Sequence, residues 1–263
     1  KKMYLSYLKT FEKLDLKAIP MQADTGPIGG DLSHEFIILA DTGESEVFLD
    51  KNLLNVDIKN VDYSKKNIDE IIDKFSKLYS ATDEKYNDSE FNRSVEKKNQ
   101  LHTRGIEIGH IFYFGDKYSK SLKALINTKE GKNINPQMGS YGIGVSRLVG
   151  ATIEANYNNN IMKWPKSISP FDVVIIPSIS KNNKENLQKA EKIYQELKKQ
   201  NIDVLLDDVD ENMSNKFKKH DLIGIPFQVI IGSKSAENKF EFKELNSESE
   251  LLSLEDIKSK LKR

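Results

Sequence analysis

The stretch MGSYGIGVSRLVGATIEA, residues 138–155, decides the fold. Its first residues are typical of a strand, and Gly142 and Gly144 predict a turn directly after it. Apolar residues then recur at helical spacing, which predicts a helix with an inward apolar stripe. The stripe consists of Val145, Leu148, Val149 and Ile153. Arg147, one of four arginines beside 36 lysines, therefore lies just past a glycine turn, at the start of a helix.

Two interpretations of Arg147 follow from this position. A planar guanidinium grips two phosphate oxygens at once, glycines let a ligand approach the backbone, and helix N-terminal amides favour anions. The stretch would then be a nucleotide phosphate site. Alternatively Arg147 forms a salt bridge on the helix surface, with Glu154 as its partner. Because Gly-x-Gly is a weak signal, spacing alone favours the second interpretation.

The stretch RGIEIGHIFYFG, residues 104–115, predicts an apolar strand that carries Glu107 and His110. Residues three apart on a strand point to opposite faces, unless a bulge at Gly109 intervenes. A polar group on a buried strand needs a partner or a ligand. The pattern leaves open a hydrogen-bonded core histidine with an edge glutamate, or a binding site.

The stretch GPIGGDLSHEF, residues 26–36, combines three glycines with a strand-like end. It indicates either a loop close to a ligand or a hairpin turn. Ser33, His34 and Glu35 are adjacent on one strand, so they cannot form a Ser-His-acid triad among themselves. The four histidines show no zinc-ligand spacing, so no metal site is predicted.

The rest of the chain suggests two parts with a boundary near residue 168. Residues 49–103 are rich in lysine, asparagine and aspartate and predict a small helical insertion or lid. Residues 169–263 follow a β-α-β-α-β-β-α order, which implies a mixed sheet covered by helices. One charged helix there carries Lys216, Lys218 and Lys219, which suit either phosphate contacts or a solvated surface.

Composition excludes several classes of protein. Acidic and basic residues balance at 40 each, so the net charge gives no indication of a nucleic-acid partner. The absence of cysteine excludes disulfides and thiolate metal sites and fits a reducing compartment. No apolar run approaches the roughly 20 residues that a membrane helix needs, so no membrane association is expected.

Five stretches, taken in order, resemble the second half of bacterial-type prolyl-tRNA synthetases, which are class II aminoacyl-tRNA synthetases. They are GPIGGDLSHEF, GIEIGHIFYFGDKYS, MGSYGIGVSRLVGATIEA, WPKSISPF and KFKKHDLIGIPFQVIIG. The resemblance implies an α/β (α+β) chain. Residues 1–168 would form the C-terminal part of the antiparallel-sheet catalytic domain, and residues 169–263 a small mixed-sheet anticodon-binding domain.

The resemblance also implies a cytoplasmic, homodimeric enzyme of translation. Proline would be activated with ATP and Mg²⁺ to prolyl-adenylate and transferred to tRNA(Pro). Arg147 would hold the γ-phosphate, as the catalytic arginine of class II motif 3, and Ser140, Gly142 and Gly144 would complete the ATP site. The proline-side candidates are Glu107, His110, Phe112, Ser140 and, more weakly, Glu35. Lys216, Lys218 and Lys219 would contact tRNA.

Three departures from the family pattern carry expectations of their own. Motifs 1 and 2 should precede the first helix and are absent, so we expect a truncated piece that makes no adenylate alone. Residues 49–103 are too short for an editing domain, so this is expected to be the short-insertion form, without hydrolysis of alanyl-tRNA(Pro). Val209, Asn212 and Ser214 stand where the family usually has arginines and a glycine.

Two alternatives of other kinds stay open. A catalytically inactive tRNA-binding fragment or paralogue would keep this architecture, although it would not need an ATP clamp. Another class IIa synthetase, for threonine, glycine or histidine, is the second alternative. The strand GIEIGHIFYFG favours proline, since it is the strand that resembles the prolyl enzyme's pocket.

Overall fold

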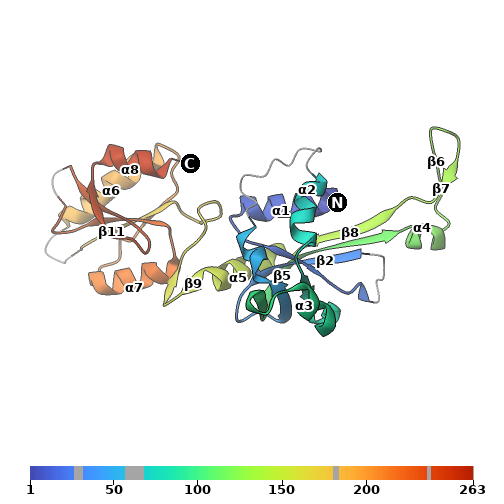
Figure 1. Ribbon diagram of the computed structural model, residues 1–263. Coiled ribbons are helices and arrows are strands. Elements are labelled where there is room, and N and C mark those ends of the chain that lie inside the picture. Colours follow the sequence, from blue (N-terminus) through green and yellow to red (C-terminus); the bar gives the residue numbers. More distant parts are fainter. Residues whose placement is uncertain (27–31, 57–67, 180–183, 236–237, 263) are drawn as a thin grey trace. The chain divides into compact units, whose positions relative to one another are not determined.

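The computed structural model describes residues 1–26, 32–56, 68–179, 184–235 and 238–262. The chain divides into two units, Lys1–Ala155 and Asn156–Arg263, which are considered separately (Figure 1). No helix among the described residues combines the length and apolar character that crossing a bilayer requires.

The described part of unit 1 is built on a six-stranded sheet, in which β5 is the longest strand, with 16 residues. The strands are β1 (Ile19–Gln22), β2 (Leu32–Leu39), β3 (Ser45–Asp50), β4 (Ser80–Thr82), β5 (Gln100–Gly115) and β8 (Met138–Ile143). Their order is β2-β1-β4-β3-β5-β8, and a further β2–β5 pairing joins the first five into a closed ring. All pairs are antiparallel except β1–β4.

Helix α1 (Lys2–Lys13) covers one side of this sheet and anchors the core of unit 1. The helix is amphipathic, and its buried side chains are Tyr4, Leu5, Tyr7, Leu8 and Phe11. Phe11 lies against Phe36 of β2 with ring centroids 5.7 Å apart, and both rings are fully buried. Truncating such a ring to alanine typically costs about 3–5 kcal/mol, so this contact fixes the helix on the sheet.

The segment 49–103 is helical in part, as expected: it contains α2 (Ile68–Ser76), and also α3 (Asp88–Ser94) and short 3-10 turns. It also supplies β4 and the start of β5, which pattern reasoning missed. Ser80, Ala81 and Thr82 are buried between β1 and β3. Part of this segment therefore belongs to the sheet itself, and its assignment as a short insertion stays a prediction.

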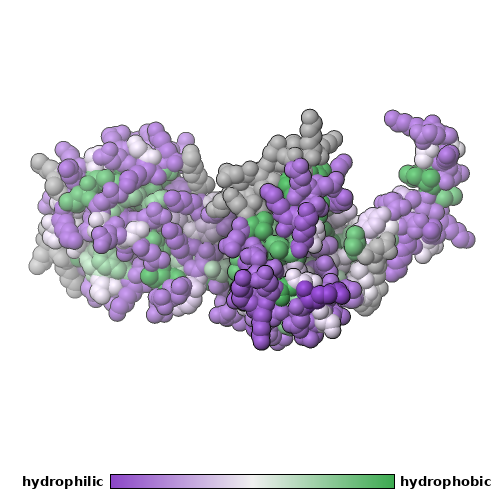
Figure 2. Space-filling view, viewed as in Figure 1, coloured by the Kyte–Doolittle hydropathy of each residue, from purple (hydrophilic) through white to green (hydrophobic). Residues whose placement is uncertain are grey.

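Strands β5 and β8 continue into a projecting arm that holds α4 (Lys117–Ser121) and the hairpin β6 (Ile126–Asn127)–β7 (Asn133–Ile134) (Figure 1). Figure 2 shows an apolar patch on this hairpin, where Leu125 and Ile126 are exposed.

Helix α5 (Val145–Asn156) follows β8 directly, which confirms the predicted strand, glycine turn and helix. The predicted inward stripe is wrong. Val145 is 73% exposed and Val149 is 56% exposed, while the helix packs on the core through Leu148 and Ala151. The helix meets the sheet along one narrow side only, so three of the four stripe residues stay at the surface of the described chain.

Unit 2 has the predicted mixed sheet. After the hairpin of β9 (Tyr157–Asn158) and β10 (Ile161–Met162) come β11 (Val173–Pro177), α6 (Glu185–Lys198), β12 (Val204–Leu206), α7 (Met213–Ile223), β13 (Phe227–Ile231), β14 (Phe240–Glu244), β15 (Glu250–Leu252) and α8 (Leu254–Leu261). The sheet order is β12-β11-β13-β14-β15, with three parallel strands and two antiparallel ones.

Helices cover both faces of this sheet, and its central strands β11 and β13 are therefore buried throughout. Val173 and Ile175 pack with α6 and α8, while Val174 and Ile176 pack with α7. The segment before β11 is also part of unit 2, since Trp164 Nε1 donates to the carbonyl of Ile223 at 2.9 Å. The domain boundary predicted near residue 168 lies after this segment and stays a prediction.

A substitution at Gly105 tests how closely strand β2 approaches strand β5. A Cβ there would overlap the buried Cγ2 of Ile37 and lie 2.9 Å from the carbonyl oxygen of Ile38. We expect Gly105→Ala to lower the free energy of unfolding of unit 1 by about 1–3 kcal/mol. Gly150→Ala is the control, because a Cβ there meets nothing within 4 Å. It should stabilise helix α5 by up to about 1 kcal/mol; equal effects in denaturant unfolding would contradict the prediction.

Candidate active site

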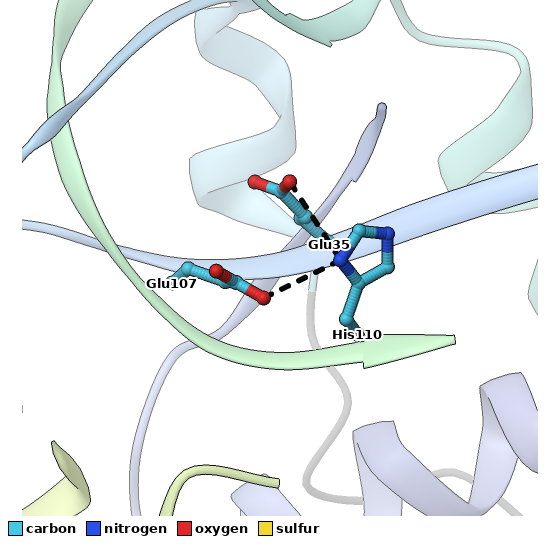
Figure 3. Close-up of side chains that lie close together, drawn as sticks. All are labelled: Glu35, Glu107 and His110. Atoms are coloured by element: carbon cyan, nitrogen blue, oxygen red, sulfur yellow. Dashed lines mark ion pairs between the residues drawn. The ribbon is translucent and has the colours of Figure 1, made fainter. Parts of the chain in front are cut away.

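A β-bulge in β5 brings Glu107 and His110 to the same face of the sheet. In the β2–β5 register Phe36 lies opposite Gly109 and Ile37 opposite Glu107, so Ile108 is the extra residue. An extra residue shifts the alternation of side chains by one. His110 Nδ1 consequently lies 3.4 Å from Glu107 Oε1 (Figure 3). From the sequence, the two side chains could share a face only if a bulge occurred at Gly109. The structure has such a bulge one residue earlier, at Ile108.

Strand β2 contributes two more side chains to this cluster. Glu35 lies directly opposite His110, and its Oε1 is 3.7 Å from Nδ1 (Figure 3). Ser33 Oγ is hydrogen-bonded to the other ring nitrogen, Nε2, at 2.5 Å. The imidazole therefore has two carboxylates at one nitrogen and a buried hydroxyl at the other.

His34 points to the opposite face, as alternation along a strand requires. Its ring meets Tyr4 of α1 edge-on at 5.4 Å, and burial lowers its pKa to about 4. The prediction that the adjacent Ser33, His34 and Glu35 form no triad is confirmed. The imidazole that Ser33 contacts comes from His110, which lies 77 residues away in sequence.

Arg147 lies at the end of the same cluster. It donates from Nη1 to the carbonyl oxygen of Glu107 at 3.0 Å, and Nη1 is 3.4 Å from Glu107 Oε2. Glu44, in the β2–β3 turn, is its other ion-pair partner at 3.4 Å. The predicted partner Glu154 is wrong, because that carboxylate accepts a hydrogen bond from Thr42. Glu107 thus bonds both Arg147 and His110.

Strand β8 lines the cluster from the far side of β5. Ser140 lies opposite Phe112, and Gly142 opposite His110. The Phe112 ring stacks on the imidazole of His110 with centroids 3.9 Å apart. A Cβ on Gly142 would meet nothing within 4 Å, so the described chain itself does not demand glycine there.

The two carboxylates differ in their electrostatics. Burial, together with the charge of Glu107, raises the pKa of Glu35 to about 7. The hydrogen bond from His110, with the charges of His110 and Arg147, lowers the pKa of Glu107 despite its partial burial. Ligand atoms of Glu35, Glu107 and His110 lie within 4.8 Å of one another. Such a cluster suits a cationic group, whether an ammonium or a metal ion.

The prediction that Lys216, on the basic helix α7 of unit 2, contacts tRNA requires a correction. Lys216 is fully buried, and its ammonium donates to the carbonyls of Pro177 and Asp207 at 3.0 Å each. Because burial leaves no surface for a phosphate to reach, Lys216 cannot serve as the predicted tRNA contact in this structure. Lys219 pairs with Asp207 at 2.9 Å and stays partly exposed, whereas Lys218 is exposed.

Sequence reasoning missed Ser33 and Glu44. The polar pair Ser33 and Glu35, two apart in an apolar strand, is the signal for a polar patch on one face of β2. Glu44 lies in a turn, and nothing in its neighbourhood indicates a guanidinium 103 residues further on.

Comparisons with known proteins show the fold: it is that of part of a class II aminoacyl-tRNA synthetase catalytic domain followed by an anticodon-binding domain. Residues 172–263 match the family model described as "Anticodon binding domain". A prolyl-tRNA synthetase from Giardia lamblia, solved in complex with prolyl-adenylate, has the same fold. Its TM-score is 0.63 at 17% identity, over 97% of this chain and 42% of that one.

In sequence, the chain is similar to bacterial proline–tRNA ligases over nearly its whole length. It is 51% identical to the one from Pelagibacter ubique over 258 residues, 97% of this chain and 58% of that protein. It is 50% identical to the one from Rhizobium etli over 240 residues, 90% of this chain and 54% of that protein. The chain thus spans little more than half the length of these curated relatives.

The pKa of Glu35 predicts a pH-dependent stability. Between its ordinary value of 4.5 and about 7, the folded chain keeps a proton that the unfolded chain has released. This group's contribution to stability therefore falls as pH rises through that window. We expect Glu35→Gln, measured against the wild type by denaturant unfolding, to gain relative stability from pH 4.5 to 7.5. Exposed Glu70→Gln is the control, and a pH-independent difference for Glu35→Gln would contradict the assignment.

Lys216 and Lys218 provide a matched pair of lysines on one helix. Lys216→Met leaves two buried carbonyl oxygens without their donor, so we expect unit 2 to lose about 1–3 kcal/mol in its free energy of unfolding. The exposed Lys218→Met should change it by less than about 0.5 kcal/mol. Equal losses in thermal or denaturant unfolding would show that the Lys216 ammonium is not structural.

Proposed function

We propose that this chain forms the proline and ATP side of the catalytic site, with the anticodon-binding domain, of a proline–tRNA ligase. The observation that carries the proposal is that Glu107 bonds both Arg147 and His110. It thereby connects the stretch 138–155, which contains Arg147, with the stretch 104–115, which contains His110. The 51% identity to a proline–tRNA ligase supports it. The enzyme would convert proline and ATP to prolyl-adenylate and pass the prolyl group to tRNA(Pro).

On the ATP side, Arg147 is proposed to bind the γ-phosphate. Its guanidinium is half exposed and paired with the exposed Glu44, so a phosphate can compete for it. A fork of donors fits two phosphate oxygens, which a lysine ammonium cannot match. Gly142 and Gly144 would admit the nucleotide to the backbone, with Ser140 beside them. The open space at Gly142 supports this interpretation, since no neighbouring atom of the described chain requires a glycine at this position.

On the proline side, Glu35 and Glu107 are proposed to receive the secondary ammonium of proline. Two carboxylates on one partly buried face stabilise a cation there. His110 would hold both carboxylates in place through Nδ1, and the Phe112 ring stacked on it would provide an apolar wall for the pyrrolidine. Ser140, opposite Phe112 in β8, borders the same space.

Mg²⁺ is proposed to enter with ATP and to neutralise its phosphates, since magnesium is commonly held through substrate phosphates and a few carboxylates. Unit 2 is proposed to bind the anticodon region of tRNA(Pro), with Lys218 and Lys219 as phosphate contacts. A cytoplasmic location and a homodimeric full-length enzyme complete the proposal. We further propose that residues 1–263 alone form no adenylate and do not hydrolyse alanyl-tRNA(Pro).

The test of function is amino-acid-dependent ATP–pyrophosphate exchange. It is measured on a protein in which this chain is extended to the length of its curated relatives. All twenty amino acids are compared. Exchange with proline alone supports the proposal, whereas exchange with threonine, glycine or histidine would point to another class IIa enzyme. No exchange from a folded protein would favour the tRNA-binding module.

Arg147→Lys tests the ATP clamp in the same assay. A lysine keeps the charge but loses the two-pronged contact, so we expect the KM for ATP to rise by roughly 10- to 100-fold, the equivalent of one or two charged hydrogen bonds. The KM for proline should change much less. Arg93→Lys, on the exposed side of α3, is the control and should leave both constants unchanged. An unaltered KM for ATP in Arg147→Lys would remove Arg147 from the site.

A further inference from the structure

We propose that Glu44 is a counter-ion that competes with phosphate for Arg147, and that it thereby limits how tightly the site holds ATP and the pyrophosphate formed from it. The proposal rests on the proposed function, because it takes the γ-phosphate of ATP as the ligand of Arg147. Glu44 has no role in the sequence-based assignment of the site. Its carboxylate oxygen Oε1 lies 3.4 Å from Arg147 Nη1.

The turn between β2 and β3 fixes the main chain of Glu44. Arg104 of β5 donates from Nε to the carbonyl oxygen of Gly43 at 2.6 Å and from Nη2 to that of Glu44 at 3.1 Å. On the helix side, the hydroxyl of Thr42 donates to Glu154 of α5 at 2.7 Å. The turn therefore holds Glu44 beside α5. The Glu44 side chain is 56% exposed, so its carboxylate can leave Arg147 by rotation of the side chain alone.

The guanidinium of Arg147 is occupied on one side only. In the part of the chain that the structure describes, its hydrogen bonds and ion pairs all run through Nη1. The acceptors are the carbonyl oxygen of Glu107 at 3.0 Å, Glu107 Oε2 at 3.4 Å and Glu44 Oε1 at 3.4 Å. Nε and Nη2 can therefore form the two parallel hydrogen bonds by which an arginine binds phosphate oxygens. A phosphate has a place to bind before Nη1 is released.

A phosphate bound in this way would share the charge of Arg147 with two carboxylates. Glu107 has a second positive partner, because its Oε1 lies 3.4 Å from His110 Nδ1. Among the described residues, the carboxylate of Glu44 has only Arg147 as an ion-pair partner. Like charges close to one guanidinium repel each other, so Glu44 weakens phosphate binding. Neutralising Glu44 removes this repulsion and the competing ion pair together.

The competition bears on both the substrate and the product of adenylate formation. When an oxygen of the proline carboxylate attacks the α-phosphorus, the bond from this phosphorus to the bridging oxygen breaks. The electron pair of that bond leaves with the bridging oxygen, and the β- and γ-phosphates depart together as pyrophosphate. The γ-phosphate can thus stay on Arg147 in substrate and product alike. Glu44, by returning to Nη1, favours the release of pyrophosphate.

The direction of the effect separates this role from a structural one. If Glu44 only oriented Arg147 or stabilised the turn, its loss would weaken phosphate binding. If Glu44 competes, its loss strengthens phosphate binding. An exposed ion pair has a small free energy, so we expect a change of about two- to fivefold.

The test is calorimetric titration of inorganic pyrophosphate in the absence of divalent cations, on the chain extended to the length of its curated relatives. Glu44→Gln should lower the Kd for pyrophosphate by about two- to fivefold. Glu46→Gln is the matched control: it removes the same charge two residues away, at a side chain that is 48% exposed and pairs with Arg104. It should leave the Kd unchanged. An equal or higher Kd in Glu44→Gln, or no binding by either the wild type or this variant, would overturn the proposal.

An Arg147→Met background shows whether the effect acts through the guanidinium. Because Glu44 and phosphate compete for this one group, most of the gain from Glu44→Gln should disappear when Arg147 is replaced. A gain of the same size in both backgrounds would show that Glu44 acts on some other cation, and would contradict the proposal.

A kinetic measurement on the same extended protein connects the ion pair with turnover. In pyrophosphate exchange, Glu44→Gln should lower the KM for ATP by about two- to fivefold and leave the KM for proline unchanged. Equal changes in both constants, or a higher KM for ATP, would exclude competition at Arg147. If the wild type activates no amino acid, the proposed function fails, whereas the pyrophosphate titration still decides the role of Glu44.

Discussion

The bulge at Ile108 is the constraint on which the candidate site depends. Without the extra residue, Glu107 and His110 would face opposite sides of β5, and Glu35 would meet only one of them. The bulge also turns the carbonyl of Ile108 toward Gly144, whose amide donates to it at 3.0 Å. The same irregularity thus assembles the polar face and fixes the start of α5, where Arg147 lies.

Sequence reasoning could predict the elements but only part of their contacts. Strand β8, the glycine turn and helix α5 follow from local spacing, as does the apolar run of β5. The order of elements from β11 to α8 was also predicted, except for the short strand β15, which the pattern missed. The pairing of His110 with Ser33, and of Arg147 with Glu44, joins residues 77 and 103 positions apart. No local pattern encodes such contacts, because they depend on which strands become neighbours in the sheet.

The two errors about helices have a common physical origin. In α5 the apolar spacing was read as a buried stripe, yet only a narrow side of the helix meets the sheet, and Val145 and Val149 stay exposed. In α7 the basic spacing was read as a surface, yet Lys216 is fully buried. Periodicity identifies a helix and its faces. Which face turns inward is decided by the neighbours, and a buried carboxylate can draw a lysine into the core.

Asp207 is that neighbour in unit 2. Burial favours its neutral form, but hydrogen bonds from Lys219 and His220 and the charge of Lys216 outweigh this and lower its pKa to about 2. In unit 1 the balance is the opposite: burial, with the negative charges of Glu107, Glu84 and Asp83, raises the pKa of Glu35, and the imidazole of His110 opposes this only in part. A buried acid that is surrounded by cations stabilises its domain, whereas one that is short of cations is ready to receive one. This difference supports the proposal that Glu35 serves binding, whereas Asp207 stabilises unit 2.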